Sequence, residues 1–98
     1  MAVPPGDMTT PEALAAPPRP TPRLIHVETP VNPLTRLTDL AAVGALARSA
    51  GALLSCDSTF ASPIATRPAE YGVDLVIHSL TKYVGGHSDL IAGAALGS

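Results

Sequence analysis

The sequence predicts an α/β fold built on a mostly parallel sheet. Short apolar segments recur along residues 23–97, and an amphipathic helical pattern joins the first two of them. Segments that are apolar on both faces are typical of parallel strands with helices on each side of the sheet. A strand, a helix and a second strand form the connection that parallel strands need. A chain of 98 residues has room for one such small domain.

The first predicted elements lie in residues 23–51. "RLIHVE" (23–28) has the pattern of a short strand, and the two prolines of "TPVNP" (29–33) end it. "LTDLAAVGALARSAG" (37–51) has the 3.6-residue periodicity of a helix, with its apolar residues on one stripe. Thr38 is a suitable N-cap for this helix, and Gly51 is a suitable residue to end it.

The remaining elements follow at short intervals. "ALLSC" (52–56) predicts a second strand, entered directly from the helix, and "RPAEYG" (67–72) predicts a single helical turn. "DLVIHS" (74–79) predicts a third strand, and "LIAGAALG" (90–97) predicts a fourth. Residues 1–22 hold most of the eleven prolines, so we expect a disordered proline-rich leader there and the folded domain in residues 23–98.

Composition narrows the possible partners. Apolar residues make up 46% of the chain and charged residues 14%, and the formal net charge is -2. This balance argues against nucleic acid or an anionic membrane as a partner. The sequence lacks both the roughly 20-residue apolar run of a membrane helix and the basic start of a secretory signal. Cys56 is the single cysteine, which fits a protein of the reducing cytoplasm.

Polar residues follow each of the first three predicted strands. They occupy residues 28–32, 57–59 and 79–82, and the last group contains Lys82, the single lysine of the chain. The carboxyl ends of parallel strands share one edge of a sheet, where ligands bind. A lysine amine shielded from water can attack a carbonyl, such as the aldehyde of pyridoxal phosphate. That cofactor also needs a carboxylate for its ring nitrogen and small donors for its phosphate, which Asp57, Ser79 and Thr81 can supply.

Three stretches resemble the Cys/Met-metabolism (trans-sulfuration) family of pyridoxal-phosphate enzymes: "VETPVNP" (27–33), "DSTFASP" (57–63) and "RPAEYGVDLVIHSLTKYVGGHSDLIAG" (67–93). That family includes cystathionine synthases and lyases, methionine γ-lyase and O-acetylhomoserine sulfhydrylases. The resemblance implies part of the large domain of an aspartate-aminotransferase-like (fold type I) enzyme. It also implies γ-elimination or γ-replacement on cystathionine, methionine or O-acyl-homoserine substrates, by a lyase or transferase.

The same resemblance assigns roles to five residues. Lys82 corresponds to the lysine that binds the cofactor covalently, and Asp57 to the partner of the ring nitrogen. Ser79 and Thr81 correspond to phosphate-binding residues, and Asn32 lies beside the ring hydroxyl. One departure is Ser58, where many relatives carry asparagine.

Members of the family are several times longer than this chain. The glycine-rich phosphate segment, the tyrosine that stacks on the ring and the arginine that binds the substrate carboxylate have no counterpart here. We therefore expect the 98-residue chain to be inactive by itself and to need a partner chain, whereas full-length relatives are expected to be homo-oligomers. The alternative is a non-catalytic truncated remnant or an association module.

Simpler interpretations stand beside these roles. Lys82 can be a surface lysine, Asp57 can cap a loop, and Ser79, Thr81 and Asn32 can bond their own turns. The strand-end charge of Glu28 is left out of the site. The three histidines lack metal-ligand spacing, and His78 and Cys56 are expected to be packed in the core. "GGHSD" (85–89) resembles a phosphate nest or, equally, a flexible turn.

Overall fold

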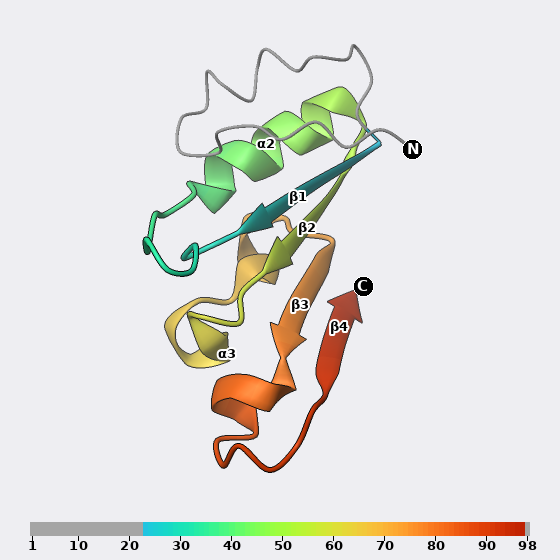
Figure 1. Cartoon of the computed structure of the whole chain (residues 1–98). Helices are drawn as coiled ribbons and strands as arrows, with labels where there is room; N and C mark the ends of the chain where they lie inside the picture. Colours follow the sequence, from blue (N-terminus) through green and yellow to red (C-terminus); the bar gives the residue numbers. More distant parts are fainter. Residues whose placement is uncertain (1–22, 98) are drawn as a thin grey trace.

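The computed structural model describes residues 23–97. The predicted leader, residues 1–22, lies outside the described residues, so the division at residue 22 stays a prediction. A four-stranded sheet forms the centre of the fold, in the order β1 (Leu24–Glu28), β2 (Leu53–Asp57), β3 (Leu75–Ser79) and β4 (Gly93–Gly97) (Figure 1). The first three strands are parallel, and β4 is antiparallel to β3. The mostly parallel sheet is thus confirmed. The first three strands begin one residue later than predicted, and β4 begins three residues later.

Helix α2 (Leu40–Ala50) connects β1 to β2. Its N-cap is Asp39, whose carboxylate accepts the N–H of Ala42 at 3.0 Å, so the prediction of Thr38 was wrong. Thr38 is buried instead, and its N–H donates to the Thr29 hydroxyl at 3.1 Å. A carboxylate suits the N-cap because it also interacts favourably with the positive end of the helix dipole. Gly51 ends the helix with φ at 64°, as predicted.

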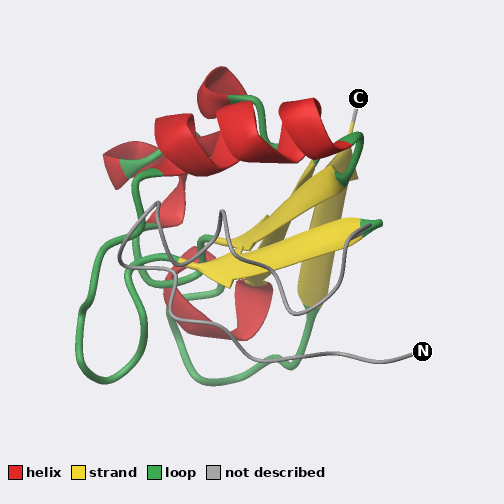
Figure 2. Cartoon of the chain, turned by 90° about the horizontal axis from the view of Figure 1, so that it is seen from above, coloured by secondary structure: helices red, strands yellow, loops and turns green. Residues whose placement is uncertain are grey.

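The core lies between α2 and one face of the sheet (Figure 2). It consists of residues from the first three strands, α2 and the segment before β3: Val27, Leu40, Val43, Ala47, Leu54, Cys56, Val73 and Val76. His78 is 6% exposed, which confirms its packed position in β3.

The opposite face of the sheet is apolar but exposed at its amino end. Leu24 and Leu53 are partners in the register of β1 and β2, and they are 56% and 59% exposed. Leu75 of β3 is 37% exposed. The prediction of a sheet covered on both faces is therefore wrong for the described residues. At the amino end of the strands, a helix within residues 23–97 covers only the face that packs against α2.

Three short segments complete the described chain: α3 (Ser62–Ala65), the single turn η1 (Pro68–Tyr71) and the turn η2 (Leu80–Val84). The turn predicted over residues 67–72 is confirmed by η1. No helix within residues 23–97 is long and apolar enough to cross a membrane.

Gly44 allows α2 to approach η1 closely. A Cβ at this position would lie 2.4 Å from the carbonyl oxygen of Tyr71, a distance that real Cβ atoms do not adopt. Gly44→Ala should lower the free energy of unfolding by about 1–2 kcal/mol, because overpacking outweighs the gain in helix propensity. Urea unfolding followed by circular dichroism measures this. The exposed Ser49→Ala on the same helix is the control and should change stability by less than about 0.5 kcal/mol. A Gly44→Ala variant more stable than wild type would contradict the close contact.

Cys56 lies in the middle of the core and is 0% exposed. Burial and the neighbouring Asp57 carboxylate raise the pKa of its thiol to about 11. A buried, protonated thiol is a poor nucleophile. The thiol is therefore structural in this fold.

Two results should follow from the buried Cys56 thiol. An aromatic disulfide reagent at pH 8 should label it only as fast as the chain opens. Because the folded pKa lies above the unfolded value of 9.0, this thiol's contribution to stability is complete below pH 9 and is lost as the pH rises to about 11. Urea unfolding at pH 8 and pH 10.5 measures the loss, and Cys56→Ala should show a smaller drop. Immediate, complete labelling in native buffer would contradict the buried position.

Candidate functional site

The carboxyl ends of β1, β2 and β3 lie at the same end of the sheet (Figure 1). A cavity of about 750 Å³ lies there. Its lining residues come from these strand ends and from the segments that follow them: Glu28, Asn32, Asp57, Thr59, Phe60, Ser79, Thr81, Lys82, Tyr83, Ser88, Leu90 and Ile91. The structure thus brings all five predicted site residues around one cavity.

Asp57 is the last residue of β2 and is half-buried. Its Oδ1 accepts the N–H of Thr59 at 2.9 Å, which holds the carboxylate at the start of the following loop. Glu28 is its register partner at the end of β1. Alternation along the strands therefore places two carboxylates side by side at this edge.

Ser79 is the last residue of β3, and Thr81 lies two residues further on, in η2. The backbone N–H of Ser79 donates to the hydroxyl of Thr59 at 2.8 Å. The Thr81 hydroxyl accepts the N–H of Ala92 at 2.9 Å and donates to the Ala92 carbonyl at 3.2 Å. Thr81 therefore joins η2 to the segment before β4, in addition to lining the cavity.

Lys82 lies in η2, where the backbone departs from helical geometry with φ at -91° and ψ at -118°. Its side chain lines the cavity and is exposed. The shielding of the Lys82 amine from water that the sequence predicts is thus not provided by residues 23–97. The reason is geometric, since η2 lies at the rim of the sheet and the described chain leaves its outer side open.

Asn32 lies in the loop after β1 and is exposed. Its backbone N–H donates to Oε1 of Glu28 at 3.4 Å, and its side chain is among those that line the cavity. Glu28 was set aside as a strand-end charge, but it also lines the cavity. Its position at this edge agrees with the sequence-based expectation for residues 28–32, because Glu28 and Asp57 both end parallel strands and neighbouring strands place such ends at the same edge.

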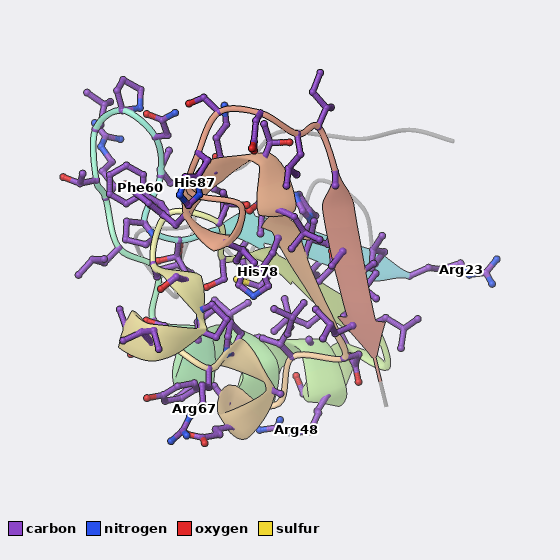
Figure 3. The ribbon with its side chains drawn as sticks, turned by 90° about the horizontal axis from the view of Figure 1, so that it is seen from below. Arg23, Arg48, Phe60, Arg67, His78 and His87 are labelled. Atoms are coloured by element: carbon purple, nitrogen blue, oxygen red, sulfur yellow. The ribbon has the colours of Figure 1, made fainter. Side chains whose placement is uncertain are left out.

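Aromatic residues form part of the wall. Phe60 and Tyr83 meet edge to face, with ring centroids 6.3 Å apart and ring planes at 85°. Neither residue could be assigned to the cavity from sequence, since no local pattern pairs residues of two separate loops. Figure 3 shows Phe60 at the opposite end of the sheet from Arg23. Within the described residues, no arginine lines the cavity.

The histidines take structural positions. His26 Nδ1 lies 2.8 Å from the Ser55 hydroxyl, and His87 Nδ1 lies 3.1 Å from the Gly85 carbonyl oxygen. Residues 23–97 contain no cluster of three metal-ligating side chains.

A family model described as Cys/Met metabolism PLP-dependent enzyme matches residues 2–98. The match includes residues 2–22, beyond the stretches on which the resemblance rests. Canavanine gamma-lyase of Rhizobium leguminosarum bv. trifolii is 54% identical over 92 residues, which are 94% of this chain and 23% of that protein. A probable cystathionine gamma-synthase of Herpetosiphon aurantiacus is 50% identical over 92 residues, which are 94% of this chain and 29% of its own length.

The solved structures that this chain matches include a protein of the same kind as these relatives. Cystathionine gamma synthase from Xanthomonas oryzae pv. oryzae, in complex with cystathionine, matches with a TM-score of 0.90 and 47% identity. The match covers 94% of this chain and 24% of the solved chain. The chain thus spans about a quarter of the length of such relatives, and its sheet is part of a fold type I architecture. With its family match running from residue 2 to residue 98, this chain belongs to the Cys/Met metabolism family of pyridoxal-phosphate (PLP)-dependent enzymes.

Proposed function

We propose that residues 23–97 form the cofactor-binding part of an enzyme of sulfur amino-acid metabolism. Its reaction is elimination or replacement at the γ-carbon of cystathionine, methionine or O-acyl-homoserine substrates. One observation carries the proposal: a single cavity gathers the only lysine of the chain, a carboxylate and two hydroxyls at the carboxyl edge of a parallel sheet.

The residues present fit pyridoxal phosphate. Asp57 supplies a fixed carboxylate, one oxygen of which is already oriented by the Thr59 N–H. Ser79 and Thr81 supply hydroxyls within two residues of each other at the cavity, and Lys82 would supply the amine for the aldehyde carbon. When bound, the cofactor withdraws electrons from the α-carbon of an amino acid.

Each side chain then has a stated task. The Asp57 carboxylate would hold a proton on the ring nitrogen, and the Asn32 side chain would lie beside the ring hydroxyl. Lys82 Nζ would hold the cofactor at its aldehyde carbon and, as a free amine, would move protons between substrate carbons. The Thr81 hydroxyl can turn its hydrogen from the Ala92 carbonyl to a phosphate oxygen while still accepting the Ala92 N–H.

The substrate class, the association state and the location are proposed from the family, from the exposed residues and from Cys56. The substrate is a small amino acid, as the family description implies. Homo-oligomerisation, or association with a partner chain, would cover the exposed leucines of the open sheet face. A cytoplasmic location agrees with the buried, unpaired Cys56.

A second candidate is a non-catalytic association module. The exposed side chain of Lys82 and the exposed apolar sheet face favour it, because a working site shields its lysine and a finished domain covers such faces.

An assay of turnover by the isolated chain tests whether it is a complete enzyme. Neither the cofactor-binding part of an enzyme nor an association module should turn over substrate by itself. The 98-residue chain with added pyridoxal phosphate is expected to release no 2-oxo acid above the Lys82→Ala background from cystathionine, methionine or O-acetylhomoserine. The physical reason is that no arginine lines the cavity within residues 23–97 and that water reaches the lysine. A coupled 2-oxo acid assay measures this. Turnover that depends on Lys82 would show that the described cavity is sufficient for catalysis.

A further inference from the structure

Thr59 links the ends of two neighbouring strands. Its N–H donates to Asp57 Oδ1 at 2.9 Å, and its hydroxyl oxygen accepts the N–H of Ser79 at 2.8 Å. The residue is half-buried and lines the cavity. One threonine thus contacts both the carboxylate that ends β2 and the backbone that ends β3.

The hydrogen bond from the Ser79 N–H to the Thr59 hydroxyl takes the place of a backbone hydrogen bond of the sheet. Ser58 N–H still donates to the Ile77 carbonyl at 3.0 Å, which extends the β2–β3 ladder by one step. The next donor in a parallel ladder is the N–H two residues beyond that carbonyl, and it would bond the Ser58 carbonyl. This donor is the Ser79 N–H, and it bonds the Thr59 side chain instead. The loop can therefore turn away from the sheet without leaving this N–H unpaired.

We infer that Thr59 is a positioning residue that fixes the Asp57 carboxylate relative to Ser79. This inference rests on the proposed function, in which these two residues bind two different groups of one cofactor molecule, the ring nitrogen and the phosphate. The spacing between the two anchors then sets how well the cofactor fits. Asp57 and Ser79 lie on different strands, and Thr59 bonds directly to both.

If Thr59 has this role, loss of its hydroxyl should affect the binding of pyridoxal phosphate but not the binding of pyridoxal. Pyridoxal lacks the phosphate, so its binding does not depend on the spacing between Asp57 and Ser79. Loss of the Thr59 hydroxyl should weaken pyridoxal phosphate binding by about tenfold, which corresponds to about 1.4 kcal/mol. The dissociation constant of pyridoxal should change by less than about twofold. General damage to the fold would weaken the binding of both compounds to the same extent.

The test uses the full 98-residue chain and three variants. Thr59→Val removes the hydroxyl but keeps the shape and the backbone donor to Asp57, and Thr59→Ser restores a hydroxyl. Thr66→Val is the matched control on a half-buried threonine that does not line this cavity. Amide hydrogen exchange of Ser79 is measured without cofactor, and both dissociation constants are measured by equilibrium dialysis. If Thr59→Val loses its circular dichroism spectrum, Thr59→Ala takes its place.

In Thr59→Val we expect the Ser79 amide to exchange about tenfold faster and the affinity to fall for pyridoxal phosphate alone. Thr59→Ser should restore both, and Thr66→Val should change neither. Unchanged exchange at Ser79, or equal effects on the two compounds, would overturn the inference. If wild type binds no pyridoxal phosphate, the proposed function fails, and the positioning role falls with it even if the Ser79 exchange confirms the hydrogen bond.

Discussion

Lys82→Ala should remove most of the covalent retention of pyridoxal phosphate by this chain. Lys82 is the only lysine, so its removal leaves the terminal α-amino group as the only primary amine. The measurement is borohydride reduction in the presence of the cofactor, followed by denaturation, desalting and absorbance of the protein-bound pyridoxyl group. Retention should fall to the level set by the α-amino group.

Lys82→Arg is the matched control, because it keeps the positive charge at the cavity without a nucleophilic amine. It should retain as little cofactor as the alanine variant. Both variants should remain folded, since the Lys82 side chain is exposed and the core does not contain it. Retention in either variant equal to that of wild type would exclude Lys82 as the attachment site.

Replacing Asp57 should produce the second large effect. Asp57→Asn keeps the shape of the side chain and an acceptor for the Thr59 N–H, but it cannot hold a proton on the ring nitrogen as a carboxylate does. The dissociation constant for pyridoxal phosphate should rise by roughly ten- to a hundredfold, the range expected for a hydrogen bond to a charged group. Equilibrium dialysis measures the change directly.

Glu28→Gln provides the control for charge alone. Glu28 is the register partner of Asp57 and lines the same cavity, so its replacement removes an equal charge from the same edge. Its effect should be a slight gain in affinity, because one carboxylate fewer repels the phosphate. An equal loss in both variants would mean that Asp57 has no specific role.

Local patterns were enough to predict most of the fold. β2 and β3 are apolar segments bounded by turn signals, and α2 has a regular apolar stripe ended by Gly51. These features depend on residues that are close in sequence. The N-cap was missed because Thr38 and Asp39 are both suitable, and the choice was decided by tertiary structure, in which Thr38 bonds the distant Thr29 hydroxyl.

The candidate site was partly predictable for the same reason. The rule that parallel strands end at one edge was sufficient to bring Asp57, Ser79 and Lys82 together. The role of Thr59 was missed because it depends on a hydrogen bond across strands, from the Ser79 N–H to a side chain 20 residues away. The exposure of Lys82 was also not predictable, since shielding depends on what packs over η2 and not on the strand that precedes it.

We propose that this cavity holds pyridoxal phosphate through Lys82. The most direct test is to reduce the wild-type chain with borohydride in the presence of the cofactor and to map the pyridoxyl adduct by peptide mass spectrometry. We predict one adduct per chain on the peptide that contains Lys82, and its amount should fall when free pyridoxal phosphate is diluted below the dissociation constant. An adduct found only on the terminal amine, or on no peptide at all, would contradict the claim.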